Sequence, residues 1–550
     1  MAIESTKRDI TRMNEILSVL IKYGFGNFVN RDLRSKYKIF SKVAPEAKEY
    51  DSNTRLRLVF QELGTTFIKL GQTLSTFPNL VGYDMAQELA KLQEAAPVTP
   101  YSEVEEVIED EFGKPVDEIF EDFTKEPVAS ASIGQVHKAF YKNILVAVKV
   151  QHPHIQETIA TDIRLMKKVA PYLNNVDTLK SYNIPAIIKV FEKDMRNELN
   201  YTIEAMNAVH MKDLLKKDEV YIPDIYLEAS TSRVLTMEFL DGVSLSKVFD
   251  APDSDYDKKK IATMGADSYI KQILIYGFYH ADPHPGNIFV LDRDIVAFVD
   301  FGMMGHLSND LRDDLANLFI FISQGDAQLL TKQLYYMGII KDKNDFNDVQ
   351  DEIIHVLDRY YGAQFNDISS VMRELVESNV LKDYGVVIPR DLMMVVRTIT
   401  MVYDFGNELD SSFNTTEILK PYAKKLVLNK FSPKNIERQS HEFSMDLDYI
   451  SKKIPNSIMN LLNIVSDDGQ IKLSLASNEL DSLNNIFTRI VNELVLAIII
   501  AAIIVGSSLI LHADIGFKLF GYSAIGLVGF LFSAILGGVL IILILTRGNY

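Results

Sequence analysis

Residues 279–287 read YHADPHPGN, and residues 296–302 read VAFVDFG. The two prolines and the glycine of the first segment prevent a regular helix, so this segment is predicted to be an irregular loop. Two apolar runs on either side of the acidic turn 292–294 are typical of a short β-hairpin. Asp300 would then follow directly after a buried strand.

Together these segments carry the residue types that phosphoryl transfer requires. The reaction needs a carboxylate that orients or deprotonates the acceptor hydroxyl, and oxygen ligands for Mg²⁺ on the nucleotide phosphates. We predict that Asp282 is the catalytic carboxylate and that Asn287 and Asp300 hold Mg²⁺. The alternative, that Asp-Pro and Pro-Gly only build turns, is disfavoured because Asp282 and Asp300 lie eighteen residues apart across a hairpin.

The composition excludes several classes of protein. The 550 residues include 57 Lys and Arg against 74 Asp and Glu, a formal net charge of −17, so no extended basic surface for nucleic acid is expected. The absence of cysteine excludes disulfides, thiolate metal sites and cysteine nucleophiles, and is consistent with a reducing cytoplasm. The length predicts one catalytic unit with appended segments.

Two long uncharged runs lie near the C-terminus. Residues 494–511 and 519–545 are each long enough to cross a bilayer as a helix, and small residues in both would allow close helix packing. We therefore predict a transmembrane helical hairpin rather than an apolar helix pair buried in a soluble core. Arg489 and Arg547 flank the pair and favour cytoplasmic flanks. The expected location is the cell membrane, with a multi-pass anchor and a cytoplasmic soluble domain.

An amphipathic helix is predicted over residues 53–76, where apolar residues recur at helical spacing. Gly64 and Gly71 lie seven residues apart, and glycines inside a helix suggest the close approach of another backbone. Lys69 and Gln72 occupy polar positions of the same helix. Taken alone, they are ordinary solvated side chains.

A turn of small residues precedes a strand that carries a lysine. Residues 129–139 read ASASIGQVHKA, and residues 145–150 are predicted to be a strand. Such a turn can place backbone over nucleotide phosphates while the strand lysine, Lys149, supplies a cation to the α- and β-phosphates. The residues expected to cover the nucleotide are Ala129, Ser130, Ala131 and Ser132.

The region 184–217 is predicted to be one long helical region that carries two candidate partners for the strand lysine. Glu198 and Glu204 both lie on it, and one of the two should pair with Lys149 and hold it over the phosphates. The sequence leaves open which glutamate does so. Solvated helix carboxylates are the alternative for either residue.

Two strands are predicted over residues 221–228 and 233–239, followed by a hinge. Backbone groups of Glu238 to Leu240 are expected to hydrogen-bond an adenine edge. Residues 257–278 are predicted to be the helix that leads into the loop of Asp282.

The order of these elements is that of a two-lobed kinase, but several features of protein kinases are missing. The chain has no G-x-G-x-x-G, Ala281 stands where protein kinases carry arginine, and no Ala-Pro-Glu follows Asp300. Without that arginine, a phosphorylated activation loop has no evident docking cation. Without the activation segment, a peptide substrate has no evident platform. Phosphorylation of proteins is therefore disfavoured.

Four motifs make the chain similar to the UbiB family of atypical kinases, also called the AarF or ADCK family. They are KLGQ at 69–72, the alanine-rich residues 129–137, Glu198-Leu199-Asn200, and residues 280–287. The resemblance covers roughly residues 55–305, and the apolar C-terminal runs match bacterial members. It implies a kinase-like fold, binding of ATP with Mg²⁺, ATPase activity, and support of the biosynthesis or distribution of ubiquinone and other isoprenoid lipids.

The resemblance also implies a gate over the active site. A helix carrying Lys69, Gly71 and Gln72 would lie across the pocket and exclude protein substrates, facing Glu198 or Glu204. Asn200 departs from the family, which carries aspartate there, so a charge that could face Lys69 is missing.

The predicted fold class is therefore α+β, a two-lobed protein-kinase-like fold with an N-terminal helical extension and two C-terminal transmembrane helices. The expected partners are the lipid bilayer, an isoprenoid lipid or quinone precursor, and proteins of lipid biosynthesis. Three functions stay open: a lipid or small-molecule kinase, an ATPase that moves isoprenoid lipids, and a nucleotide-binding scaffold without turnover. The predicted segments are an N-terminal extension at 1–112, an N-lobe at 113–240, a C-lobe at 241–425, a helical extension at 426–493, and a transmembrane hairpin at 494–545.

Overall fold

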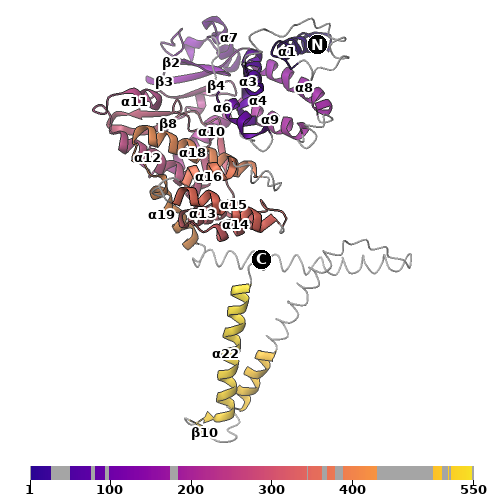
Figure 1. The fold of residues 1–550 in the computed structure, drawn as a ribbon. Helices are drawn as coiled ribbons and strands as arrows, with labels where there is room; N and C mark the ends of the chain where they lie inside the picture. Colours follow the sequence, from indigo (N-terminus) through magenta and orange to yellow (C-terminus); the bar gives the residue numbers. More distant parts are fainter. Residues whose placement is uncertain are drawn as a thin grey trace, which may run out of the picture. The chain divides into compact units, whose positions relative to one another are not determined.

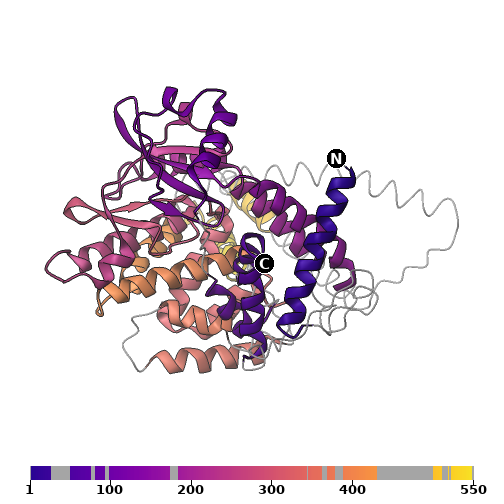
Figure 2. The same cartoon turned by 90° about the horizontal axis from the view of Figure 1, so that it is seen from above.

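The computed structural model comprises two compact units, Met1–Glu437 and Arg438–Tyr550. Figures 1 and 2 show the helices and strands from two directions. The predicted boundaries between the five sequence segments stay predictions. The residues that the structure describes are 2–25, 50–75, 81–92, 98–173, 184–342, 345–361, 368–377, 388–429, 499–510, 518–519 and 522–547.

A four-stranded antiparallel sheet, in the order β1-β2-β3-β4, forms the smaller lobe. Side chains of a strand alternate between its two faces. On β3, Val146, Val148 and Val150 are fully buried in a cluster with α7, so Lys149 lies on the opposite face of the sheet. The elements are β1 (Ala129–Ser130), β2 (Gly134–Tyr141), β3 (Ile144–Gln151), β4 (Val234–Glu238), α7 (Tyr101–Phe112) and the short helices η3 (Val116–Glu118) and η4 (Leu227–Ala229).

Helices from two separate parts of the chain pack together beside this sheet (Figure 1). Met13 and Leu17 of the first helix pack against Leu165, and Leu70 packs against the cluster of Ile159 and Phe191. The helices are α1 (Ala2–Lys22), α3 (Ser52–Leu63), α4 (Thr65–Ser75), α6 (Tyr83–Ala90), α8 (Ile155–Leu173) and α9 (Ile184–Glu198).

The single helix predicted over 53–76 is wrong, because the chain breaks at Gly64. This glycine has φ +86°, a conformation that ends α3 and that an L side chain rarely adopts. The expected approach of another backbone at both glycines is also wrong. Among the described residues, no neighbouring atom lies within 4 Å of an added Cβ at Gly64, and side chains of Leu92 and Phe60 crowd Gly71.

The long helical region predicted over 184–217 is two helices. Asn200 ends the first and caps the second, α10 (Tyr201–Leu215), because its side chain accepts a hydrogen bond of 3.1 Å from the amide of Thr202. The strand predicted over 221–228 is also wrong. That segment makes only isolated bridges at Tyr221 and Ile225 before a short 3₁₀ turn.

The larger lobe contains the predicted hairpin, which is confirmed as β7 (Ile288–Leu291) and β8 (Ile295–Phe298), joined by a 3₁₀ turn, η6 (Asp292–Asp294). Two further short pairings flank the loop of Asp282: β5 with β7, and β6 with β9. The remaining elements are β5 (Val243–Ser244), α11 (Leu245–Asp250), α12 (Lys258–Ile270), the π-helix η5 (Lys271–Tyr276), β6 (Phe278–His280), β9 (Met304–His306), α13 (Asn309–Gln324), α14 (Ala327–Tyr336), α15 (Phe346–Tyr361), α16 (Ile368–Glu377), α18 (Arg390–Leu409) and α19 (Thr415–Asn429).

Two buried clusters hold this lobe together and support the loop of Asp282. One joins Tyr269 of α12 to Phe298 of β8 and to Phe405 of α18. The ring of Tyr269 meets that of Phe298 edge to face, with centroids 5.2 Å apart. The other cluster joins α13 to α16, α18 and α19 around Phe319. The hairpin that carries Asp300 therefore rests on a rigid helical base.

The C-terminal unit contains a helix at residues 499–510, a β10–β11 pair (Lys518–Leu519 and Tyr522–Ser523), and α22 (Ala524–Arg547). Within the described part of the chain, no helix combines the length and the apolarity needed to cross a membrane. Residues 494–498 and 511 of the first predicted span lie outside the described residues. The predicted transmembrane hairpin over 494–545 is therefore not supported. Most of the predicted extension 426–493 lies outside the described residues.

Two helix glycines with different surroundings, Gly406 of α18 and Gly265 of α12, generate the first prediction. A methyl group at Gly406 would overlap the buried ring of Phe413, whereas a methyl group at Gly265 would meet Phe405 at 3.4 Å. We expect Gly406→Ala to lower the free energy of unfolding by about 1–3 kcal/mol through overpacking. The matched control, Gly265→Ala, should leave it unchanged or raise it by up to about 1 kcal/mol through helix propensity.

Thermal unfolding of the two variants beside the parent protein would measure the difference. Equal melting temperatures for Gly406→Ala and Gly265→Ala would contradict the close contact between α18 and Phe413.

Candidate active site

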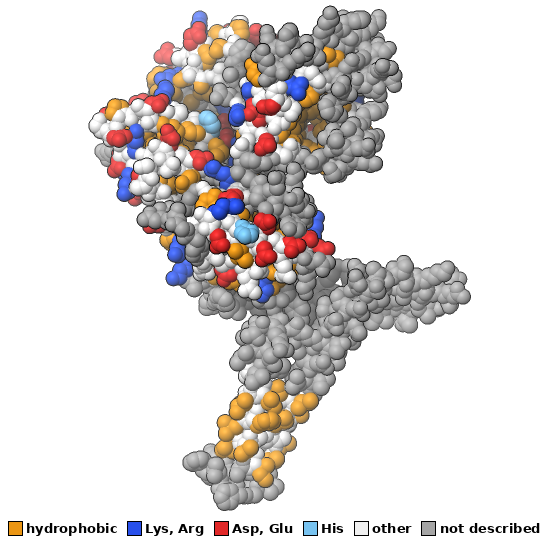
Figure 3. All heavy atoms as spheres, viewed as in Figure 1, with side chains coloured by type: hydrophobic (Ala, Val, Ile, Leu, Met, Phe, Trp, Pro, Cys, Tyr) orange, Lys and Arg blue, Asp and Glu red, His pale blue; other side chains and the backbone are white. Residues whose placement is uncertain are grey.

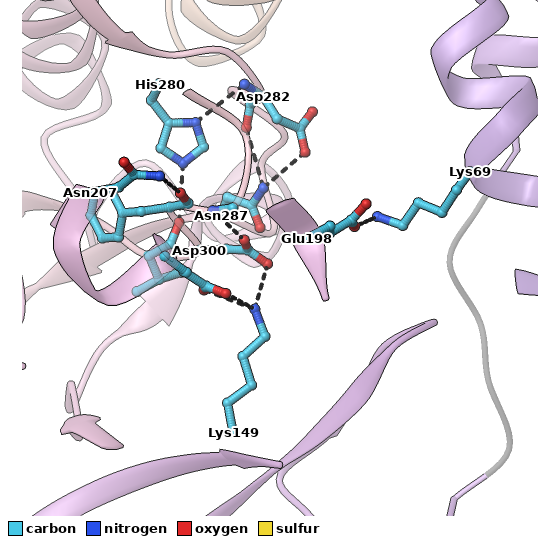
Figure 4. Close-up of polar contacts among 12 residues, drawn as sticks. Lys69, Lys149, Glu198, Asn207, His280, Asp282, Asn287 and Asp300 are labelled. Atoms are coloured by element: carbon cyan, nitrogen blue, oxygen red, sulfur yellow. Dashed lines mark hydrogen bonds and ion pairs between the residues drawn. The ribbon is translucent and has the colours of Figure 1, made fainter. Parts of the chain in front are cut away.

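A buried lysine joins the two lobes at the centre of the site. Lys149 of β3 donates hydrogen bonds of 2.9 and 3.0 Å to the two carboxylate oxygens of Glu204 on α10, and one of 3.2 Å to Oδ2 of Asp300 (Figure 4). Its ammonium group also lies 5.1 Å from the centre of the Tyr201 ring. Glu204, and not Glu198, is thus the partner of Lys149, which settles the alternative that the sequence left open.

The protonation states of Lys149, Glu204 and Asp300 depend on their burial and on one another's charges. Burial alone would lower the pKa of Lys149, but the neighbouring charges of Asp300 and Glu204 raise it well above its ordinary value. Burial raises the pKa of Glu204 to about 7, against the opposing effect of Lys149. For Asp300, burial is outweighed by Lys149 and Lys69, which lower its pKa to about 2. Lys149 and Asp300 therefore stay charged over the physiological pH range.

Asp300 is held in an unusual backbone conformation. Its φ is +60°, which is uncommon for a residue other than glycine. Its Oδ1 accepts a hydrogen bond of 3.2 Å from the amide of Gly302, and Asn207 of α10 donates one of 3.0 Å to the carbonyl of Phe301. These contacts on both sides fix the carboxylate that Lys149 meets.

Asp282 and Asn287 lie on the same loop and contact each other. Nδ2 of Asn287 donates to Oδ2 of Asp282 at 3.1 Å and to its carbonyl at 3.2 Å. The amide of Val299 donates to the carbonyl of Asn287 at 2.9 Å, which places this loop beside the residue preceding Asp300. Figure 4 shows Asn287 between Asp282 and Asp300. The three residues expected to handle the acceptor and Mg²⁺ therefore lie together.

His280 holds the loop of Asp282 through hydrogen bonds. The amide of Asp282 donates to its Nδ1 at 3.2 Å, and its Nε2 contacts the carbonyl of Val299 at 3.2 Å. Its ring lies edge to face with the buried ring of Phe301. One imidazole therefore links the loop of Asp282 to the strand end that carries Asp300.

The small-residue turn at 129–132 is fastened at several points. Ser132 accepts a hydrogen bond of 3.0 Å from the hydroxyl of Thr65, the first residue of α4. The carbonyl of Ala131 contacts Nε2 of His152 at 2.9 Å. A Cβ added at Gly134 would lie 2.5 Å from the hydroxyl of Tyr201, so this turn packs closely onto the base of the site. Ala129 and Ser130 form the short strand β1 that precedes it.

Three residues of α4 were expected to gate the pocket. Lys69 is buried and forms an ion pair with Glu198 at the end of α9 (Figure 4). Gln72 donates a hydrogen bond of 3.3 Å to the carbonyl of Leu92, and Gly71 allows Leu92 and Phe60 to pack against the helix. The charge of Lys69 also contributes to the lowered pKa of Asp300. The structure thus brings Lys69 to the site, whereas Gln72 hydrogen-bonds the carbonyl of Leu92.

The hinge backbone is partly engaged within the protein. The amide of Glu238 donates to the carbonyl of Asp224 at 2.8 Å, and the amide of Phe239 donates to the carbonyl of Leu145 at 3.2 Å. The carboxylate of Glu238 accepts hydrogen bonds of 2.8 Å from the hydroxyl of Tyr221. Of the expected adenine-binding amides, Leu240 is therefore the better candidate.

The donor set suits Mg²⁺ rather than a metal held by the protein alone. Among the described residues, no group of three or more His, Cys, Asp or Glu side chains could hold a metal ion. Asn287 and Asp300 offer one amide oxygen and one carboxylate. Mg²⁺ is typically bound by one or two carboxylates together with substrate phosphates and water, so a two-residue set fits nucleotide-bound Mg²⁺.

Sequence reasoning missed several residues that shape the site. Tyr201 lies under Lys149, Asn207 fixes Phe301, and Tyr269 supports His280 and Phe298. Tyr201 and Asn207 lie on opposite sides of Glu204 along α10. Their closeness to Glu204 in the sequence was the available signal that they lie near the site. Only the packing reveals which groups they contact.

The raised pKa of Glu204 generates a pH-dependent prediction. Between about pH 4.5 and 7, the folded protein keeps a proton on Glu204 that the unfolded chain has lost, so the stability from this residue falls as the pH rises through this range. In differential scanning fluorimetry, the melting temperature of the parent protein should fall by several degrees relative to Glu204→Gln between pH 5 and 8. Parallel melting curves for the two proteins across this range would contradict the prediction.

The chain was compared with families of known proteins. Residues 91–334 match the ABC1 atypical kinase-like domain, and residues 478–546 match the ABC1/UbiB kinase-like C-terminal domain. An uncharacterised protein encoded in the hydrogenase 1 5′ region of Clostridium pasteurianum is 30% identical over 98% of this chain and 99% of its own length.

Two kinds of named relative also match. A protein named probable protein kinase UbiB from Shewanella woodyi is 27% identical over 89% of each chain. The chloroplastic protein ACTIVITY OF BC1 COMPLEX KINASE 3 of Arabidopsis thaliana is 31% identical over 74% of this chain and 60% of its own length. The expected family resemblance is confirmed: this chain belongs to the ABC1/UbiB family of atypical kinases and has its kinase-like fold.

Proposed function

We propose that this protein is a membrane-associated atypical kinase or ATPase that uses Mg-ATP and supports the biosynthesis or handling of isoprenoid quinones and related lipids. The observation that carries the proposal is the convergence of Lys149, Glu204 and Asp300 beside Asp282 and Asn287. This set combines a fixed cation, metal-binding oxygens and a carboxylate near the acceptor, which phosphoryl transfer requires.

Each residue has a role that follows from its contacts. Lys149, kept charged chiefly by Asp300 and positioned by Glu204, would contact the α- and β-phosphates. Asn287 and Asp300 would hold Mg²⁺, which neutralises charge that develops on the phosphates. Asp282, fixed by the amide of Asn287, would orient the acceptor hydroxyl or a water molecule. Asn287 would use its Oδ1 for the metal, because its contact with Asp282 is made through Nδ2.

The helices over the site favour a small acceptor or water over a folded protein. Thr65 ties α4 to the turn that is expected to cover the phosphates, and Lys69 ties the same helix to Glu198. In this proposal, these two contacts close the side of the site that a peptide would use. Lipid-sized acceptors and hydrolysis are therefore preferred to protein phosphorylation.

The lipid part of the proposal rests on two observations. The relatives named UbiB match most of the chain, and the C-terminal unit exposes large apolar side chains (Figure 3). Exposed apolar patches of this kind mark contacts with membranes or partner proteins. A bilayer, an isoprenoid lipid or quinone precursor, and proteins of lipid biosynthesis are the proposed partners. The exposed residues include Val505, Leu509, Ile525, Val528, Leu531 and Ile535.

The central test is Mg-ATP turnover by the purified full-length protein in liposomes, with and without a polyprenyl quinone precursor. We expect turnover to rise with the lipid and to fall at least a hundredfold in Asp282→Asn. The matched control, Asp213→Asn, removes an exposed carboxylate that pairs with Lys216 on the surface and should retain parental turnover.

The products distinguish the remaining functions. A phosphorylated lipid identifies a kinase, and lipid-stimulated phosphate release without such a product identifies an ATPase. Tight ATP binding without turnover that depends on Asp282 would replace the proposal with a nucleotide-binding scaffold of a lipid-biosynthesis complex.

Lys69→Ala tests the proposed gate. The substitution leaves Glu198 without its ion pair and removes a positive charge that acts on Asp300, so ATP affinity should change at least threefold. The control, Lys216→Ala, removes an exposed, paired lysine at the C-cap of α10 and should leave ATP affinity unchanged. Superimposable ATP titrations for the parent and Lys69→Ala would remove the gating role.

A further inference from the structure

A cavity lies between α8 and α9, away from the proposed catalytic residues. Its volume is about 430 Å³, within the range of small-molecule sites in proteins. The two helices pack against each other and lie side by side in Figure 1. None of the residues placed in the catalytic set contributes to its lining, and the proposed phosphoryl transfer does not use it.

The floor of this cavity is apolar. Ile159 and Ile163 of α8 and Met195 of α9 line it, and all three are at least 94% buried. They belong to one hydrophobic cluster with Phe191, against which Leu199 also packs. Because the floor offers only aliphatic and thioether groups, it would favour a hydrocarbon group over a sugar or a nucleotide base.

The rim of the cavity is basic. Arg164, Lys167 and Lys168 extend from α8, and Arg196 extends from α9. Their side chains are 43–75% exposed, so their charged groups remain accessible to a ligand. Among the described residues that line the cavity, Glu192 is the only carboxylate.

The ion pairs of the rim leave an excess of positive charge. Glu192 pairs with both Lys167 and Arg196. Asp9 of α1 pairs with both Arg164 and Lys168. Within these described ion pairs four cations share two carboxylates, a local excess of two positive charges on a chain whose formal net charge is −17.

From this combination we infer that the cavity between α8 and α9 binds a single-chain anionic amphiphile, with its hydrocarbon chain on the apolar floor and its phosphate or carboxylate head at the basic rim. Arginine and lysine at the rim would contact such a head through charge-assisted hydrogen bonds. The source of the chain is either an isoprenoid or a fatty alkyl compound. Only the isoprenoid source rests on the proposed function.

The position of the cavity connects its occupant to the active site. Leu199 lines the cavity and directly follows Glu198, the partner of Lys69. Leu70, the residue after Lys69, packs against the cluster that forms the floor. A ligand in the cavity would therefore contact Leu199, the residue after Glu198. It would also contact the hydrophobic cluster against which Leu70, the residue after Lys69, packs.

Binding can be measured by isothermal titration calorimetry on the full-length protein held in amphipol, without nucleotide. The probes are geranyl phosphate and decyl phosphate, which have ten carbons each, with geraniol and inorganic phosphate as the separate tail and head. We expect both amphiphiles to bind at least tenfold more tightly than either fragment. Tighter binding of geranyl phosphate identifies an isoprenoid source, and tighter binding of decyl phosphate identifies an alkyl source.

Two variants test the location. Lys167→Gln with Arg196→Gln removes half of the basic rim, and Ala160→Phe fills the cavity from an exposed position. Each should weaken binding of the amphiphiles at least tenfold. The matched control, Lys142→Gln with Lys216→Gln, removes two exposed lysines from surface ion pairs elsewhere and should bind as the parent does.

Three results would overturn the inference: parental affinity in the rim variant, affinity for inorganic phosphate equal to that for the amphiphiles, or loss of binding in Lys149→Met with retention in the rim variant. The last result would place the head group in the nucleotide site. Because the titration contains no nucleotide, its failure leaves ATP turnover untouched, and a failure of turnover leaves the titration valid.

Discussion

The buried charge of Lys149 is the constraint on which the architecture of the site depends. An ammonium group taken out of water costs several kcal/mol unless anionic partners compensate for the lost hydration. Glu204 supplies one partner from α10, and Asp300 supplies another from the end of the hairpin in the larger lobe. Strand β3, helix α10 and the hairpin must therefore converge on one point, and the two lobes meet there.

That requirement explains several contacts whose residues take no part in the chemistry. Asn200 starts α10 by capping its first turn, so Glu204 faces the sheet one turn later. Tyr201 fills the space beneath the lysine, and Asn207 ties the same helix to the carbonyl of Phe301. The aspartate that the family resemblance implies at this position would also be a strong N-cap residue, so asparagine preserves the start of the helix without that charge.

A second lysine–glutamate pair at the edge of the site joins the N-terminal helices to the catalytic group. Lys69 and Glu198 meet beside Asp300, and the charge of Lys69 acts on that carboxylate. Helix α9, which ends at Glu198, also lines the cavity between α8 and α9, and Leu70 of α4 packs against the cluster that forms its floor. The same group of helices thus contacts the catalytic residues and forms a separate apolar recess with a basic rim.

The sequence alone determined the features whose signals are local. The loop of Asp282, the hairpin that leads to Asp300 and the strand of Lys149 were predictable because prolines, alternating apolar runs and fixed spacings act within a few residues. It could not choose between Glu198 and Glu204, because both lie on helical segments and the choice depends on which helix packs against β3. Nor did helical periodicity reveal the breaks at Gly64 and Asn200, since an apolar stripe continues across a bend when both helices bury the same side. Tertiary structure decided these points because burial and charge compensation act between residues that are distant in the chain, such as Lys149 and Asp300, and no local pattern records which of them meet.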